Sequence, residues 1–320
     1  MSEQTETPEV VTGGEAMGLL LAGDDVALGS ARHFQAEIAG AESNVAIGLA
    51  RLGHRVAFYG RVGDDIFGER IRRELRAEGV DVSALATDDR RETGLLFRDT
   101  VQGSPLTVVY RRTGSAATAL VLDDLPREAI RQARVLHVTG ITAALSGTAY
   151  EATLAAMTMA RDAGVQVSFD PNLRLRLASV ERWREIVEAL SRHSDVVLTG
   201  ADEAEMICPG DDPVTWFGRN GVATVVVKHG AQGASEHDSA SGRSWRSAAR
   251  SVPVVDPVGA GDAFDAGWLS ALLREQPPEQ RLTQGCAVAS LVVATRGDSI
   301  GLPDRRRRDA ALAEGPDVQR

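Results

Sequence analysis

The spacing of apolar residues divides the chain into two kinds of region. From about residue 120 onward, short apolar runs alternate with stretches in which apolar residues recur at helical spacing. This alternation predicts parallel strands in one sheet, with helices covering both of its faces. The predicted strands are VLHVTG, VQVSFD, DVVLTG and VATVVV, and the predicted helices lie at 146–163, 180–193, 260–275 and 279–295. Further short strands are predicted at about 231–255, after VATVVV.

The first hundred residues begin with a similar pattern. A strand is predicted at 10–15, where an apolar run ends in a glycine turn, and another at 55–59. Helices are predicted at 43–52 and 66–78, because apolar residues recur there at helical spacing and a glycine follows each stretch directly.

Two segments, at about 16–40 and 93–115, do not follow the alternation of strand and helix. Both contain short stretches with the pattern of strands. We therefore predict a small β-sheet lid inserted into one α/β domain that spans 10–303. The highly charged segment 304–320 has few large apolar residues, which predicts a disordered tail.

Composition narrows the class of protein. The chain has 320 residues, 43% of them hydrophobic, and a formal net charge of −10, which argues against general binding to nucleic acids or membranes. Cys208 and Cys286 lie far apart, which predicts a reducing compartment rather than a disulfide framework. The polar, acidic start and the lack of a long apolar run predict a cytoplasmic protein.

The segment 256–264 (DPVGAGDAF) carries the strongest chemical signal. Gly259 and Gly261 flank an alanine, so several backbone N–H groups can converge on one point at the start of a helix. Asp262 stands beside this point as a candidate base. An anion site next to a carboxylate is what phosphoryl transfer to an alcohol requires. The alternative is a tight strand-to-helix turn in which Asp262 only caps the helix.

Two common nucleotide-binding motifs do not occur in the sequence. A Rossmann fingerprint starting at Gly259 would need a third glycine where Phe264 stands, and no strand-terminal acid follows at the expected distance. The P-loop pattern GxxxxGK followed by Ser or Thr is absent as well. A nucleotide would therefore have to bind in another way.

Two more glycine-containing segments lie next to predicted elements. GAESN enters a helix, where Glu42 and Asn44 can offer an acceptor and an amide to a polyol; helix capping by Ser43 or Asn44 is the alternative. KHGAQG, at 228–233, follows a predicted strand at the edge of the sheet where open α/β folds bind ligands. An ordinary β-turn is the alternative there.

Scattered charged residues allow both functional and ordinary explanations. Arg112, in the predicted lid, and Arg174, after a predicted strand, can bind an anion or belong to the solvated surface. The basic run at 305–308 is better explained as a solvated tail than as a nucleic-acid site, given the acidic net charge. The six histidines show no metal-ligand spacing.

The order of the motifs is more specific than any one of them. GGE at 13–15 precedes GAESN, then YGRVGDDIFG at 59–68, then DPVGAGDAFDAG. This order resembles the ribokinase-like (PfkB) carbohydrate kinases over roughly residues 10–303. Within that family the chain is most similar to the 2-keto-3-deoxygluconate kinases, through GAESN, YRRTGSA at 110–116, DPNLR at 170–174 and ATRGD at 294–298.

The resemblance implies an ATP-dependent carbohydrate kinase with a central, mostly parallel sheet flanked by helices and a small β-sheet lid. Asp262 would be the general base for the sugar hydroxyl. The amides of Gly259, Ala260 and Gly261 would hold the transferred phosphoryl group. ATP and Mg²⁺ would be the cofactors, with Lys228, Gly230 and Gly233 in the ATP site and Glu203 and Asp256 near the magnesium.

The resemblance also implies a sugar acid as substrate. A desolvated carboxylate needs fixed cations, and the forked guanidinium of arginine suits it, which makes Arg112 and Arg174 a candidate clamp. Leu96 stands where the nearest relatives would have a Tyr, and Gly200 replaces the Asn that opens the family's NxxE magnesium motif. The residues facing the sugar acid would be Gly40, Asn44, Tyr110, Arg112, Arg174 and Asp298.

The reaction that we expect is phosphorylation of 2-keto-3-deoxygluconate to its 6-phosphate. A kinase for a neutral sugar such as fructose or ribose, a nucleoside kinase and a catalytically silent sugar sensor stay open as alternatives. Lids of this family often pair between subunits, so we expect a homo-oligomer, with no nucleic-acid or membrane partner. A monovalent cation such as K⁺ stays open as a further cofactor.

Overall fold

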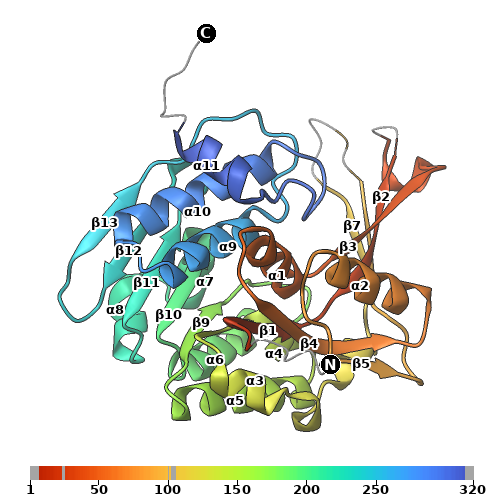
Figure 1. Cartoon of the computed structure of the whole chain (residues 1–320), viewed down its shortest axis with the longest axis horizontal. Helices are drawn as coiled ribbons and strands as arrows, with labels where there is room; N and C mark the ends of the chain where they lie inside the picture. The colour runs from red at the N-terminus through yellow and green to blue at the C-terminus, as the bar shows by residue number, and fades with distance from the viewer. Residues whose placement is uncertain (1–6, 24–25, 100, 102–105, 314–320) are drawn as a thin grey trace, which may run out of the picture.

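A computed structural model describes residues 7–23, 26–99, 101 and 106–313. Within these residues the chain forms a nine-stranded central sheet in the order β13-β12-β11-β10-β9-β8-β1-β4-β5 (Figure 1). The strands from β11 to β5 are parallel, and β12 and β13 are antiparallel additions at one edge. The strands are β1 (Val10–Gly14), β4 (Val56–Gly63), β5 (Leu85–Asp88), β8 (Val135–Thr139), β9 (Gln166–Asp170), β10 (Val196–Gly200), β11 (Thr224–Lys228), β12 (Ala234–Asp238) and β13 (Ser244–Ser247).

A separate four-stranded sheet projects from this body (Figure 1). Its order is β3-β2-β6-β7, with β2 and β6 parallel and the other pairs antiparallel. All four strands lie within the segments from which the sequence predicted a small β-sheet. They are β2 (Met17–Ala22), β3 (Phe34–Ala39), β6 (Leu95–Arg98) and β7 (Val108–Arg111).

Helices cover both faces of the central sheet (Figure 1). One group packs on the first face: α1 (Ala41–Arg51), α2 (Ile66–Ala77), α9 (Ala260–Leu273) and α10 (Pro278–Val293), with α11 (Arg305–Ala313) against α10. The other group packs on the opposite face: α3 (Arg127–Gln132), α4 (Gly140–Leu145), α5 (Gly147–Asp162), α6 (Val180–Ser191), α7 (Ala201–Ile207) and α8 (Pro213–Arg219).

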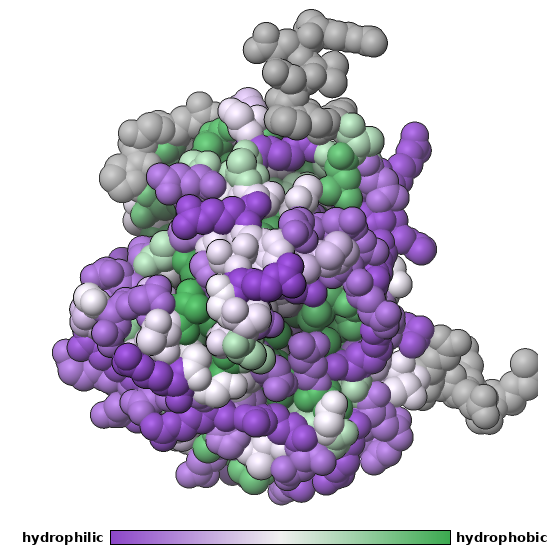
Figure 2. Space-filling model, turned by 90° about the vertical axis from the view of Figure 1, so that its left-hand side faces the viewer, coloured by the Kyte–Doolittle hydropathy of each residue, from purple (hydrophilic) through white to green (hydrophobic). Residues whose placement is uncertain are grey.

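The central strands are apolar on both sides because each side meets a layer of helices. In β10, Val196 and Leu198 belong to the core cluster on the side of α9 and α10, while Val197 belongs to the cluster on the side of α5 and α6. Successive side chains of a strand point to opposite faces, so a continuous apolar run feeds two cores. The surface beyond the sheet edge at β13 is largely hydrophilic, with apolar residues visible mainly in recesses (Figure 2).

The expected alternation of strands and helices is confirmed, with one clear error at the C-terminus. The sequence predicted disorder from 304 onward, but residues 305–313 form α11, which packs on α10. Asp304 starts the helix by accepting the N–H of Arg307, and Arg308 and Ala311 are buried. This prediction was wrong because even a strongly basic helix can pack stably on a neighbouring helix through one stripe of buried residues. The remaining residues of the predicted tail, 314–320, lie outside the described part of the chain.

The parallel strands end together at one edge of the sheet. Thr139, Asp170, Gly200 and Lys228 are the last residues of β8, β9, β10 and β11. Ligands of open α/β folds bind at this carboxyl edge, so the topology predicts where the site lies. No helix in the described part of the chain is long and apolar enough to span a bilayer.

Candidate active site

A cavity of about 580 Å³ lies at the carboxyl edge of the central sheet. The small sheet contributes Met17, Leu96 and Val108 to its wall, so both sheets enclose it. Most residues that the sequence predicted as functional meet here, although they come from distant parts of the chain. These are Gly40, Asn44, Tyr110, Arg112, Arg174, Glu203, Lys228, Gly230, Gly259, Gly261, Asp262 and Asp298.

A second cavity of about 520 Å³ adjoins the first. The two share Lys228, Gly230, Pro257 and Gly261 in their walls, so they form two lobes of one site. The second lobe contains the predicted residues Ala260 and Gly233. Its other walls are largely apolar, with Val252, Val254, Phe264, Ala289 and Val293.

The turn before α9 depends on glycine at its first position. Gly259 is the N-cap of the helix with φ +79°, and a Cβ there would lie 2.5 Å from the carbonyl oxygen of Asp298. Only glycine tolerates both conditions. At Gly261 a Cβ would meet nothing closer than 3.7 Å, the Nζ of Lys228, so the fold itself does not demand glycine there. The missing side chain leaves space at the positive end of the helix dipole.

Asp262 is held by two asparagine side chains. Nδ2 of Asn44 donates to Oδ2 at 2.8 Å, and Nδ2 of Asn172 donates to Oδ1 at 3.2 Å. Burial raises the pKa of Asp262, while the Asn44 hydrogen bond and the charge of Arg174 partly oppose that rise. The result is an oriented carboxylate that accepts a proton more readily than an ordinary aspartate, as a general base should.

Asn172 is a residue of the cavity wall that the sequence analysis did not single out. Its φ of +44° is left-handed, which is uncommon outside glycine, and Asp170 stabilises it by accepting its backbone N–H at 2.9 Å. Asparagine adopts this conformation more readily than most residues. The only signal in the sequence was the DPN turn, which indicates a turn but not that its amide reaches Asp262.

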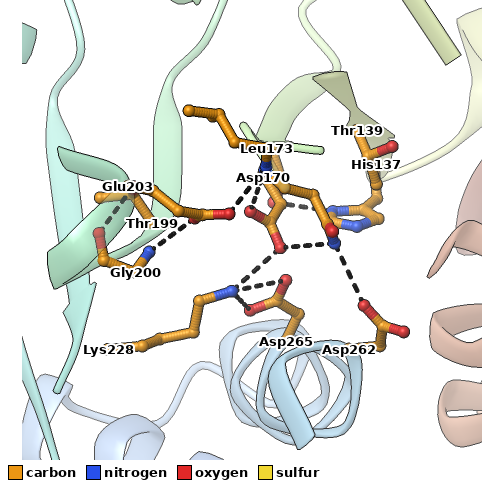
Figure 3. A network of polar contacts seen from close by, with 12 residues as sticks. His137, Thr139, Asp170, Leu173, Thr199, Gly200, Glu203, Lys228, Asp262 and Asp265 are labelled. Atoms are coloured by element: carbon orange, nitrogen blue, oxygen red, sulfur yellow. Dashed lines mark hydrogen bonds and ion pairs between the residues drawn. The ribbon is translucent and has the colours of Figure 1, made fainter. Parts of the chain in front are cut away.

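Lys228 lies in a network of buried carboxylates (Figure 3). Its Nζ donates to Asp170 at 2.9 Å and to Asp265 at 3.1 Å. Burial lowers the pKa of Lys228, but the two carboxylates outweigh burial and raise it overall. The ammonium therefore stays charged and is neutralised by the protein, although it also faces both lobes of the cavity.

The pKa values of the two carboxyl groups beside Lys228 are shifted in opposite directions. Burial would raise the pKa of Asp170, but Lys228 and a hydrogen bond with Asp265 hold it below its usual range. Burial and the neighbouring Asp170 raise the pKa of Asp265 well above its usual range. Lys228 thus holds the two acids unequally: Asp170 is the stronger acid of the pair and Asp265 the weaker.

Glu203, the residue that the sequence assigned to the magnesium motif, lies at the wall of the larger cavity. Its carboxylate accepts the backbone N–H of Leu173 at 2.7 Å and of Gly200 at 2.9 Å, which fixes both oxygens. Burial and the charge of Asp170 raise its pKa. Among the described residues no group of three His, Cys, Asp or Glu could hold a metal. A Mg²⁺ ion that takes most of its ligands from phosphates and water needs only one or two protein carboxylates.

Asp256 has a different environment from the one that the sequence predicted. It is 2% exposed, is not part of either cavity wall, and accepts a hydrogen bond from Arg98 at 2.8 Å. It also accepts the backbone N–H groups of Val258 and Gly297. An arginine already occupies the position of a cation at this carboxylate, so Asp256 does not fit the magnesium role assigned to it.

The two predicted clamp arginines are not equivalent. Arg112 forms an ion pair with Glu15, and both side chains are almost fully buried. Arg174 is exposed at the cavity wall, and in the described part of the chain it forms no ion pair. Its charge lowers the pKa of both Asp262 and Asp298. Arg174 is thus the cation available to an anionic ligand.

The remaining predicted residues also line the larger cavity. Tyr110 lies on β7, with the guanidinium of Arg112 5.4 Å from its ring centre. Leu96 and Gly200, the two departures from the expected pattern, are both in the wall. Burial raises the pKa of Asp298 to about 6, although Arg98 opposes the rise. We call the start of α9, at 259–261, the anion turn. A cavity with the carboxylate of Asp262, the anion turn and an arginine that has no ion pair among the described residues suits phosphoryl transfer to an anionic alcohol.

Comparison with known proteins agrees with this geometry. The model of the pfkB family of carbohydrate kinases matches residues 9–305. The chain is 36% identical to 2-dehydro-3-deoxygluconokinase of Bacillus subtilis (strain 168), over 95% of both proteins. It is 32% identical to 2-dehydro-3-deoxygalactonokinase of Haloferax volcanii, over 94% of this chain and 96% of that protein.

Among solved structures, a PfkB protein from Polaromonas sp. JS666 superimposes with a TM-score of 0.86. The two are 37% identical, and the match covers 95% of this chain and 99% of that one. Sequence, fold and site therefore agree, and the chain belongs to the pfkB family of carbohydrate kinases, as an ATP-dependent sugar kinase.

Proposed function

We propose that the protein phosphorylates the 6-hydroxyl of 2-keto-3-deoxygluconate, with Asp262 as general base. The observation that carries the proposal is Arg174, an exposed cation at the wall of a cavity that also holds the base and the anion turn. The names of the Bacillus and Haloferax relatives, which are kinases of 2-dehydro-3-deoxy sugar acids, support an acid rather than a neutral sugar.

The substrate carboxylate would pair with Arg174. Arg112 is already neutralised by Glu15, so we assign it a hydrogen-bonding and shaping role together with Tyr110 instead of the role of a second cation. This modifies the two-arginine clamp expected from the sequence. A carboxylate bound to a guanidinium can use two parallel hydrogen bonds, which also orients the sugar. The opposite end of the sugar, with its hydroxyl, would then face Asp262.

Asp262 would take the proton from the hydroxyl as the oxygen attacks the phosphoryl group. Asn44 and Asn172 each donate to one of its oxygens, which fixes the carboxylate in a single orientation. The backbone N–H groups of Gly259, Ala260 and Gly261, at the start of α9, would stabilise charge on the transferred group. Closure of the cavity by the small sheet would keep out water and so limit hydrolysis.

The kinases of this family use ATP with Mg²⁺. The apolar lobe beside Phe264 and Val293 would take the adenine, and Gly230 and Gly233 would let the chain pass close to the nucleotide. A bound Mg²⁺ neutralises phosphate charge and aligns the phosphoryl group for in-line transfer. Glu203 would bind its water shell, and Lys228 would add positive potential while staying paired with Asp170 and Asp265.

The test is release of ADP from MgATP by the purified protein. The sugars to compare are 2-keto-3-deoxygluconate, 2-keto-3-deoxygalactonate, fructose, ribose and adenosine. We expect the first to give the highest kcat/KM, and NMR of the product should place the phosphate on the 6-oxygen. Preference for fructose, ribose or adenosine would reject the sugar-acid assignment. No ADP release with any compound would favour a sugar sensor.

Arg182→Ala serves as the control for a variant of Arg174, because Arg182 is also an exposed arginine but pairs with Glu185 on α6. The homo-oligomer and the cytoplasmic location expected from the sequence stay predictions. So does the use of a monovalent cation.

A further inference from the structure

One buried arginine has no part in the mechanism proposed above. Arg98 is the last residue of β6 in the small sheet, and its side chain is 1% exposed. Leu96 precedes it by two residues, so both side chains point to the same face, and both line the larger cavity. The strand that covers the sugar lobe thus carries a fully buried positive charge.

Arg98 contacts two loops of the central domain. Its Nη2 lies 2.8 Å from Oδ2 of Asp256 and 3.0 Å from Oδ1 of Asp298, and its Nη1 lies 3.4 Å from Oδ1 of Asp256. Both terminal nitrogens therefore meet Asp256, in the fork-to-fork geometry that lysine cannot reproduce. The guanidinium joins the small sheet to one loop before α9 and another after α10.

These two loops shape the anion turn. Asp256 accepts the backbone N–H of Val258 at 3.1 Å and of Gly297 at 3.0 Å, so its carboxylate ties the loops to each other. The carbonyl oxygen of Asp298 packs directly against Gly259, where even a Cβ would not fit. A shift of either carboxylate would therefore move the backbone amides at the start of α9.

A buried ion pair alone is weak evidence for a special role, because such pairs often only balance their own desolvation. The position of this one is informative, since it connects the part of the pocket assigned to the sugar with the part assigned to the phosphates. We propose that Arg98 is a positioning residue that couples the two lobes. Sugar bound beneath β6 restrains the side chain of Arg98. Arg98 in turn fixes the positions of Asp256 and Asp298, and these two residues set the position of the anion turn that faces the nucleotide. The assignment of the two lobes rests on the proposed function.

The test is the affinity of a non-hydrolysable ATP analogue with Mg²⁺, measured by calorimetry with and without saturating sugar. The sugar is whichever compound of the panel above is phosphorylated, so the result does not depend on the substrate being an acid. For the wild type we expect sugar to tighten analogue binding by about fivefold or more, a typical coupling between sites. In Arg98→Met each ligand should still bind alone. The ratio of the analogue's Kd without sugar to its Kd with sugar should fall to about one.

Arg70→Met is the matched control. Arg70 also reaches the small sheet, through a hydrogen bond to the carbonyl of Ala36, but its charge is paired with Glu74 on its own helix α2. The control should keep the wild-type ratio. A merely structural role for Arg98 would lower stability, or both affinities, without changing the ratio. A wild-type ratio in Arg98→Met, or a ratio of one in the wild type, would overturn the proposal.

A second measurement needs no variant and applies even if Arg98→Met does not fold. Hydrogen exchange of the wild type with sugar alone should slow at the amides of Val258 and Gly297, the two donors to Asp256. Exchange there should stay the same when a non-substrate sugar of the panel is added. Unchanged exchange with the substrate sugar would also reject the coupling.

Discussion

Two regions of the active site, around Lys228 and around Arg174, treat charge in opposite ways. Around Lys228, the positive charge is neutralised by Asp170 and Asp265, and all three side chains are largely buried. At the sugar lobe, Arg174 is exposed and has no ion pair within the described residues. A charge that the protein has already paired can shape a site, whereas an unpaired charge at a cavity wall is available to bind. Residue type alone does not distinguish the two.

Loss of the base should have the largest effect on activity. In Asp262→Ala we expect kcat to fall by about 10²–10⁴-fold, the usual contribution of a general base. Binding of an ATP analogue should be retained, because Asp262 lies between Asn44 and Asn172 and not in the apolar lobe. Steady-state kinetics and calorimetry measure the two quantities. A variant with full turnover would remove Asp262 as the base.

Loss of the paired cation should mainly affect stability. Lys228→Met leaves the buried carboxyl groups of Asp170 and Asp265 without their partner, and breaking such a network costs about 3–5 kcal/mol. Urea unfolding followed by circular dichroism measures the change. Adding Asp265→Leu, which removes one of the two acids, should recover part of the lost stability. No recovery would mean that the network does not behave as one unit.

Loss of the unpaired cation should affect substrate binding. Arg174→Ala should raise KM for the sugar acid by roughly tenfold or more, because a hydrogen bond to a charged group contributes about 1.5–3 kcal/mol. Thermal stability should hardly change, since Arg174 is exposed. Arg182→Ala should leave both quantities as in the wild type. An unchanged KM in Arg174→Ala would remove Arg174 as the carboxylate anchor.

The smallest expected effect is a shift in pH dependence. The pKa of Asp262 is raised, mainly by burial, so kcat/KM should fall toward acid pH at a higher pH than for an exposed aspartate. The Asn44 hydrogen bond lowers this pKa. Asn44→Ala should therefore raise it further and move the acid limb to higher pH. A pH–rate profile of both proteins measures the shift, and a limb that moves to lower pH would contradict the assignment.

Much of the fold followed from local pattern. The strands β8 to β11 were predicted because each is a short, mainly apolar run, and the long helices α5, α6, α9 and α10 because apolar residues recur at helical spacing over many residues. The short helices α3, α4, α7 and α8 and the strand β5 were not predicted, since few residues carry each signal. The helix α11 was missed because its burial depends on α10, which a local pattern does not report.

The sequence by itself determined the anion turn and the family. Gly259 permits the left-handed conformation at the start of α9 whatever the surroundings, and the order of the motifs is a property of the sequence alone. Only the tertiary structure decided which charges are paired. Arg98 with Asp256 and Arg112 with Glu15 are each separated by about a hundred residues or more. Electrostatic energy depends on distance and burial, and both exist only after the two sheets have come together.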